Sequence, residues 1–221
     1  MSRVFDAVLK RLREDLLRMG SRAEAILAKA LRAVWERDAA LVDEIDRDDL
    51  EIDRLDVAID EAVLKALALQ APVAEDLREV LAIKMIATDL ERVGDLSRNI
   101  AKSARRLAAR DAVPMPAALS SLARSAQRIL REALDAFSRA DSGLAHSVVD
   151  EDDAIDAVQD EVVLLMLRQL EAQEGAVSQE VDIILVAKNL ERVADHATNI
   201  AESVILVTEA RNVKHAAKFS R

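Results

Sequence analysis

The sequence contains no cysteine and no tyrosine, and its 221 residues include only 4 glycines, 3 prolines and 2% aromatic residues. Without cysteine the chain forms no disulfide and no thiolate metal site, which fits a reducing cytoplasm and many other settings. So few glycines and prolines supply too little turn chemistry for many strands. With 51% hydrophobic and 33% charged residues, the composition is typical of a helical bundle.

Long apolar runs are also missing. No uninterrupted stretch of about 18 apolar residues occurs, and the N-terminal segment MSRVFDAVLKRLRED is amphipathic and charged, unlike a signal peptide. We therefore expect a cytoplasmic protein that does not span a membrane, with peripheral docking on a membrane protein left open. The formal net charge of −10 argues against nucleic acid as the main partner, because affinity for phosphate chains comes mostly from Lys and Arg. The same charge suits a cation-binding protein and equally an ordinary acidic one.

Apolar residues spaced three or four apart predict six long helices. Their expected ranges are 5–38, 39–68, 75–110, 117–140, 142–173 and 178–212. Pro72 interrupts the pattern between the second and third helices, and residues 111–116, with two of the three prolines, form the clearest linker. The fold class we expect is all-α, with two tandem antiparallel three-helix bundles at residues 1–112 and 113–221.

One phrase occurs twice in the chain. Residues 90–95 read LERVGD and residues 190–195 read LERVAD, and Asn-Ile-Ala follows each copy at the same spacing. The preceding helices also align, with Asp49 matching Asp152 and Asp53 matching Asp156. The chain is therefore expected to be a duplicated three-helix unit.

Each copy holds four carboxylates that the predicted hairpin brings to one level. The first set is Asp49, Asp53, Glu91 and Asp95, and the second set is Asp152, Asp156, Glu191 and Asp195. Residues four apart share one helix face, and Asp53 and Glu91 are equally distant from Pro72 along the chain. In the second copy the corresponding midpoint falls between Gln173 and Glu174. In each hairpin the position of the predicted turn thus agrees with the alignment of the carboxylates on its two helices.

Four carboxylates at one level repel one another, and burying them is costly unless they are paired. Hard cations bound by oxygen ligands would offset the repulsion, as would protonation or the adjacent Arg92 and Arg192. Asn99 and Asn199 extend each stripe and are expected to orient a carboxylate or a water. His196 has no histidine counterpart in the first copy. We therefore expect that it lies next to a metal ligand or has no role in the site, and that it is not an essential ligand. The alternative is that these acids are simply solvated.

The phrases LERVGDLSRNIA and LERVADHATNIAE, with their (Glu/Asp)-x-x-x-Asp pairs, resemble the PhoU family of phosphate-specific transport accessory proteins. The resemblance covers about residues 5–210, and its departures are small: aspartates take the Glu/Asp position at 49 and 152, and Gly94 replaces the alanine of the second copy. It implies a helical fold that is often dimeric. It also implies multinuclear metal sites on each repeat, with iron or zinc first and manganese or magnesium as alternatives.

The resemblance further implies a regulatory role without catalysis. Such a protein is a cytoplasmic negative regulator that links the ATPase of the Pst phosphate ABC transporter to a PhoR-type sensor histidine kinase, with any attachment to the inner membrane made through these partners. Composition and periodicity alone indicate only a metal-binding helical protein. Two alternatives stay open: a helical adaptor without metal, and a ferritin-like redox protein, whose usual Glu-x-x-His motif does not occur in this sequence.

Overall fold

The structure is a computed structural model that describes residues 3–172 and 177–214. The first bundle consists of α1 (Arg3–Glu36), α2 (Ala40–Gln70) and α3 (Ala74–Ala108), and the second of α4 (Ala117–Arg139), α5 (Ser142–Asp150), α6 (Asp152–Ala172) and α7 (Val177–Glu209). The described ranges contain no strand. The predicted fold class, all-α with two antiparallel helical bundles, is confirmed.

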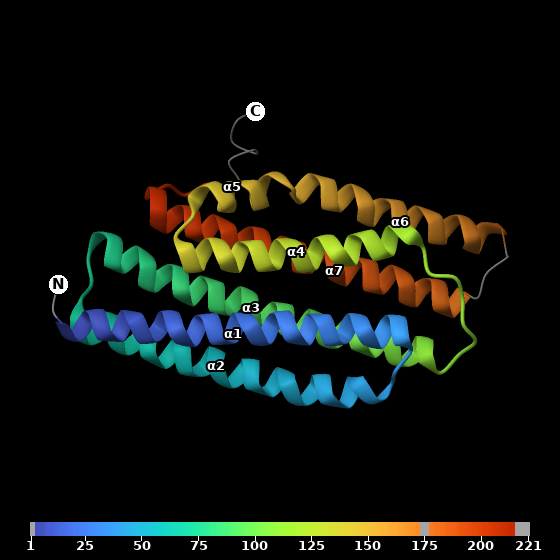
Figure 1. The fold of residues 1–221 in the computed structure, drawn as a ribbon, viewed down its shortest axis with the longest axis horizontal. Helices are drawn as coiled ribbons and strands as arrows, with labels where there is room; N and C mark the ends of the chain where they lie inside the picture. Colours follow the sequence, from blue (N-terminus) through green and yellow to red (C-terminus); the bar gives the residue numbers. More distant parts are fainter. Residues whose placement is uncertain (1–2, 173–176, 215–221) are drawn as a thin grey trace.

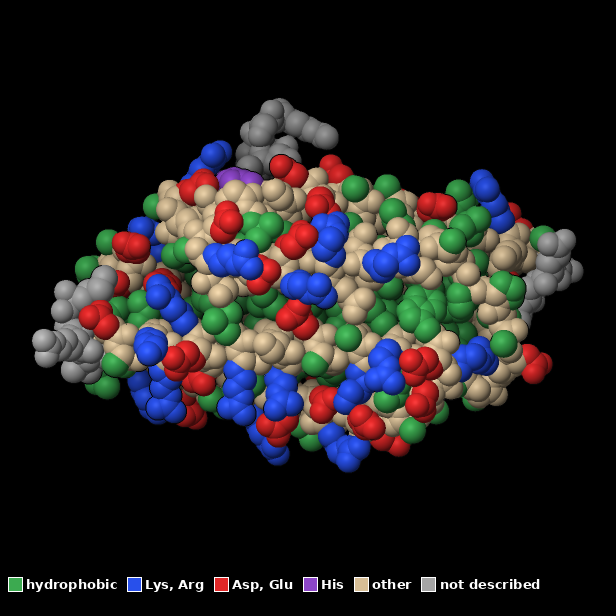
Figure 2. All heavy atoms as spheres, viewed as in Figure 1, with side chains coloured by type: hydrophobic (Ala, Val, Ile, Leu, Met, Phe, Trp, Pro, Cys, Tyr) green, Lys and Arg blue, Asp and Glu red, His purple; other side chains and the backbone are tan. Residues whose placement is uncertain are grey.

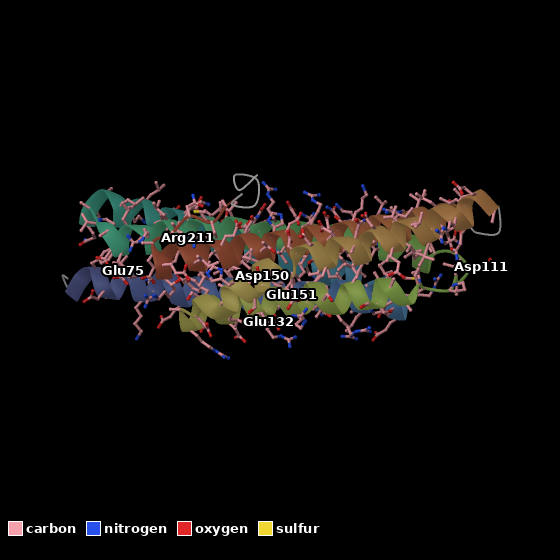
Figure 3. All side chains as sticks on the ribbon, turned by 90° about the horizontal axis from the view of Figure 1, so that it is seen from above. Glu75, Asp111, Glu132, Asp150, Glu151 and Arg211 are labelled. Carbon is pink, nitrogen blue, oxygen red and sulfur yellow. The ribbon has the colours of Figure 1, made fainter. Side chains whose placement is uncertain are left out.

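The fifth predicted helix is divided at Glu151 into α5 and α6. The Glu151 amide donates to the Val148 carbonyl at 3.3 Å, one residue short of the α-helical spacing. Four consecutive acids at residues 150–153 disfavour a continuous helix here, because aspartate is a weak helix former and like charges repel. Arg128 of α4 donates to the carboxylates of both Glu151, at 3.0 Å, and Glu132, at 2.9 Å, and Figure 3 labels these two acids.

The connection predicted at Pro72 is confirmed. Ala71 ends α2 in the left-handed region with φ 42°, and Val73 is extended ahead of α3. The second predicted midpoint, between Gln173 and Glu174, lies outside the described residues. Its flanking helices end at Ala172 and begin at Val177.

The helices run along one long axis, and the two bundles lie side by side (Figure 1). Between the bundles, α3 packs along α7 and α1 contacts α4. The predicted apolar faces of α3 and α7 are fully buried, at Ile83, Ile86, Ala87, Leu90, Val93, Ile100, Ile183, Val186, Ala187, Leu190, Val193 and Ile200. Burying one such isoleucine or leucine contributes about 1.5–3 kcal/mol. The motif carboxylates therefore project from two helices that the core holds firmly.

The surface is mixed in charge. Figure 2 shows Lys and Arg interspersed with Asp and Glu over one face, while hydrophobic side chains are visible mainly in the band between the two bundles. Among the described helices, none combines the length and apolarity needed to cross a bilayer.

Candidate functional site

Three predicted carboxylates of the second bundle lie together. One oxygen from each of Asp156 on α6, Glu191 and Asp195 on α7 lies within 4.8 Å of the other two. Burial raises the pKa of Glu191, and the charges of Asp195 and Asp156 raise it further. Such a set of mutually repelling oxygens suits a hard cation. Within residues 3–172 and 177–214, no other group of three or more acids and histidines brings its ligand atoms this close.

Asp152, the fourth predicted acid of this cluster, has a separate hydrogen-bond partner. Its Oδ1 accepts a bond from the Thr198 hydroxyl at 3.1 Å. Burial is the main cause that raises the pKa of Asp195, and the charge of Asp152 is the next. Arg192 is exposed, and its positive charge lowers the pKa of Glu191 only in part. Arg192 and Lys188 thus offset only part of the negative charge of the second cluster.

The first cluster contains an arginine. Nη1 of Arg98 lies 2.9 Å from Asp49 and 3.7 Å from Asp95, and its Nε donates to Asp46 at 3.2 Å. Asp49 is only 2% exposed. Burial raises the pKa of Asp49 to about 6, although the charge of Arg98 opposes the shift, and Asp53 adds to it. A buried carboxylate is therefore held directly by a guanidinium.

The remaining acids of the first cluster also lie near one another. Burial raises the pKa of Glu91, and the charges of Asp95 and Asp53 contribute. Arg92 is exposed and lies 3.2 Å from Asp95 and 3.4 Å from Glu91. The hairpin thus assembles the predicted acids, but together with two arginines. A metal at this cluster stays a prediction.

Gly94 allows the close approach of Asp49 to α3. A Cβ atom built on Gly94 would lie 2.7 Å from the Asp49 Oδ1 atom and 3.2 Å from Ile52 Cδ1. The second repeat has Ala194 at this position. The glycine in the first copy of the phrase is therefore explained by the buried aspartate beside it.

Two predicted neighbours of the second cluster make contacts across the bundle interface. Nδ1 of His196 lies 2.8 Å from the Asp89 Oδ1 atom on α3, and the Asn199 amide donates to the same oxygen at 3.3 Å. Asn99 in the first repeat is exposed and accepts from Lys102 at 3.4 Å. The predicted roles of Asn99, Asn199 and His196 beside the ligands stay untested. His196 and Asn199 join the two bundles.

Sequence reasoning missed Arg98 and Asp89. Both occupy positions where the two copies of the repeat differ in charge: Thr198 aligns with Arg98, and Asn189 aligns with Asp89. A comparison of the aligned copies for differences would have included both, although the copies also differ in charge at other positions, such as Ala82 and Asp182.

Proteins of one known family match this chain in both sequence and structure. A family model described as the PhoU domain matches residues 16–104 and 119–204, one segment in each bundle. A phosphate-specific transport system accessory protein PhoU homolog from Xylella fastidiosa (strain Temecula1) is 36% identical over 203 residues, which are 92% of this chain and 84% of the relative. The homolog of the same name from Pseudomonas aeruginosa is 32% identical over 216 residues, or 97% and 89% of the two chains.

Solved structures agree with these matches. The crystal structure of PhoU from Pseudomonas aeruginosa superposes with a TM-score of 0.91 at 32% identity, over 94% of this chain and 100% of that one. The phosphate transport system regulatory protein PhoU from Streptococcus pneumoniae gives a TM-score of 0.88 at 26% identity, over 95% and 99%. With both repeats matched in sequence and the whole architecture matched in structure, this chain belongs to the PhoU family.

Proposed function

We propose that this chain regulates phosphate transport by binding other proteins and not by catalysis. The proposal is supported chiefly by the match of both repeats to the PhoU domain. The names of its relatives place those proteins in the phosphate-specific transport system, as accessory or regulatory components.

Within this role, we propose a negative regulator of the phosphate-starvation response. It would act in the cytoplasm, as a homodimer, and connect the ATPase of a Pst-type phosphate transporter to a PhoR-type sensor histidine kinase. The support is the family membership, together with a mixed-charge surface suited to reversible contacts with other proteins. Any association with the inner membrane would be made through those partners.

The second bundle is our candidate for cation binding. Asp156, Glu191 and Asp195 would hold the ion, with Asp152 adjacent, since their oxygens converge and their charges repel. A bound cation would neutralise that repulsion. Iron or zinc is proposed first, and manganese or magnesium would also accept an all-oxygen set.

The regulatory proposal is tested by affinity purification of the tagged chain from cells grown in high phosphate. The transporter ATPase or the sensor kinase is expected in the eluate and absent from a tag-only control. Deletion of the gene is expected to activate phosphate-starvation genes in high phosphate. Absence of both partners and unchanged expression would contradict the proposal.

Elemental analysis tests the cation separately. Protein purified without chelator should contain a stoichiometric metal, whereas a metal-free adaptor should contain none. Oxygen consumption after iron loading would point instead to the redox alternative, and we expect none.

A further inference from the structure

The first acidic cluster differs from the second by an arginine, Arg98, that contacts two of its four carboxylates. The Arg98 guanidinium contacts Asp49 at 2.9 Å, Asp95 at 3.7 Å and Asp46 at 3.2 Å. These partners come from both α2 and α3, the two helices that supply the predicted ligands. One side chain therefore bridges the two faces that a cation would otherwise bridge.

The second repeat lacks a counterpart of Arg98 and also a counterpart of Asp46, the aspartate that accepts a hydrogen bond from Arg98. Thr198 aligns with Arg98, and Val149 aligns with Asp46. The Thr198 hydroxyl donates to Asp152 at 3.1 Å. A hydrogen bond from a neutral hydroxyl thus replaces an ion pair with a guanidinium, so the cluster keeps its negative charge for another cation.

Packing around Asp49 holds the arginine contact in place. The Asp49 side chain is almost completely buried, and its Oδ1 lies 2.7 Å from the point that a Cβ atom on Gly94 would occupy. Separating a buried carboxylate from its charged partner is strongly unfavourable. A divalent cation entering between Asp49 and Asp95 would also meet the like charge of Arg98 at short range.

We propose that the Arg98 guanidinium takes the place of a cation in the first repeat, so that this chain binds a cation in its second repeat only. The inference rests on the cation site proposed above and adds an asymmetry to it. In the first cluster a residue of the chain supplies the central ion pair, and in the second an ion from solution would supply the positive charge.

Zinc binding by the full chain tests the asymmetry. Each protein is dialysed against Zn²⁺, and bound zinc is measured by elemental analysis. Replacing the first-repeat acids by Asp53→Asn with Glu91→Gln should leave the zinc content unchanged. Replacing the second-repeat acids by Asp156→Asn with Glu191→Gln should reduce it to background.

Exchanging residues between the repeats tests the role of the arginine itself. Arg98→Thr should raise the zinc content about twofold, because both repeats would then present a comparable oxygen set. Thr198→Arg should remove zinc from the second repeat. Arg92→Thr is the matched control: Arg92 also pairs with Asp95, but the second repeat keeps its counterpart Arg192, so no gain is expected.

The outcomes separate the two proposals. Zinc lost on substitution of the first-repeat acids, or no gain in folded Arg98→Thr, would overturn the inference while leaving cation binding in place. A wild-type chain that binds no zinc in dialysis and contains no other metal as purified would overturn both. Circular dichroism checks folding. If Arg98→Thr does not fold, the two acid pairs and Thr198→Arg decide the result.

Discussion

The Asp89 carboxylate on α3 lies 2.8 Å from Nδ1 of His196 on α7, although the two residues are 107 positions apart in sequence. Both side chains are mostly buried, at 14% and 18% exposed. The contact therefore joins one bundle to the other away from bulk water.

Replacing Asp89 with alanine should destabilise the fold by about 1–2 kcal/mol, because His196 and Asn199 both lose an acceptor. Thermal unfolding should occur at a midpoint lower by about 2–8 °C, given the chain length. Arg32→Ala removes an exposed intrahelical pair with Glu36 and should have little effect. A double-mutant cycle with His196→Ala measures the coupling, and strict additivity would contradict it.

A second contact between the bundles joins one carboxylate to two arginines. Asp182 on α7 is buried and accepts from Arg106 Nε at 2.7 Å and from Arg110 Nη1 at 2.9 Å. Asp182→Ala should cost about 3 kcal/mol, because two arginines lose their buried partner. Arg110→Ala should cost less, since Arg106 remains. Urea unfolding measures both, and equal losses would show that Arg106 contributes nothing.

Cation binding at the second cluster should weaken on acidification. The pKa values of Asp156, Glu191 and Asp195 are all raised, mainly by desolvation, so protons compete with a cation at a higher pH than they do at acids with ordinary pKa values. Zn²⁺ titrations over a pH series should show affinity falling as pH decreases. Glu171→Gln, which removes an exposed acid on α6, is the control and should leave the profile unchanged. A flat profile would contradict the prediction.

Stability should depend on pH through Asp49. Its pKa is raised from 3.8 to about 6 in the folded chain, so the folded state binds more protons than the unfolded state between these values. This contribution to the free energy of unfolding should fall by roughly 2 kcal/mol as pH rises through that window, and stay constant above it. Asp49→Asn should remove this slope, whatever its effect on absolute stability.

The matched control for that experiment is Glu61→Gln, which changes an exposed acid of the same helix that does not contribute to the pKa shift of Asp49. Urea unfolding of the three proteins at several pH values provides the comparison. An identical pH dependence in wild type and Asp49→Asn would show that Asp49 does not titrate in this range.

Alanine should be tolerated differently at the two copies of one position. Gly94→Ala gains about 1 kcal/mol of helix propensity, but its Cβ would lie 2.7 Å from the Asp49 carboxylate and displace it. We expect a net loss of about 1 kcal/mol, as for other overpacked sites. Ala194→Gly should lose about 1 kcal/mol from propensity alone. A stabilised Gly94→Ala would show that Asp49 moves freely.

Periodicity in the sequence predicted the helices and the buried faces of α3 and α7, because core packing repeats every three or four residues. The sequence also predicted the turn at Pro72, since proline cannot continue a helix. The division at Glu151 was not predicted. It depends on repulsion among neighbouring acids and on Arg128, which comes from another helix.

The sequence predicted which acids of the candidate site lie together, but not which basic side chains contact them. The spacing of Glu91 and Asp95 fixes which helix face they share, and the structure places them near Asp49 and Asp53 as expected. The position of Arg98 depends on side-chain direction, and the contact of His196 depends on how the bundles pack. Neither is encoded in local spacing.

The interruption at Glu151 gives α6 its own first turn. Ile155, Val162 and Met166 are the buried residues that anchor α6 in the second bundle. A residue inserted between Asp156 and Val162 would therefore turn Asp152 and Asp156 about the helix axis relative to this anchor, and out of alignment with α7.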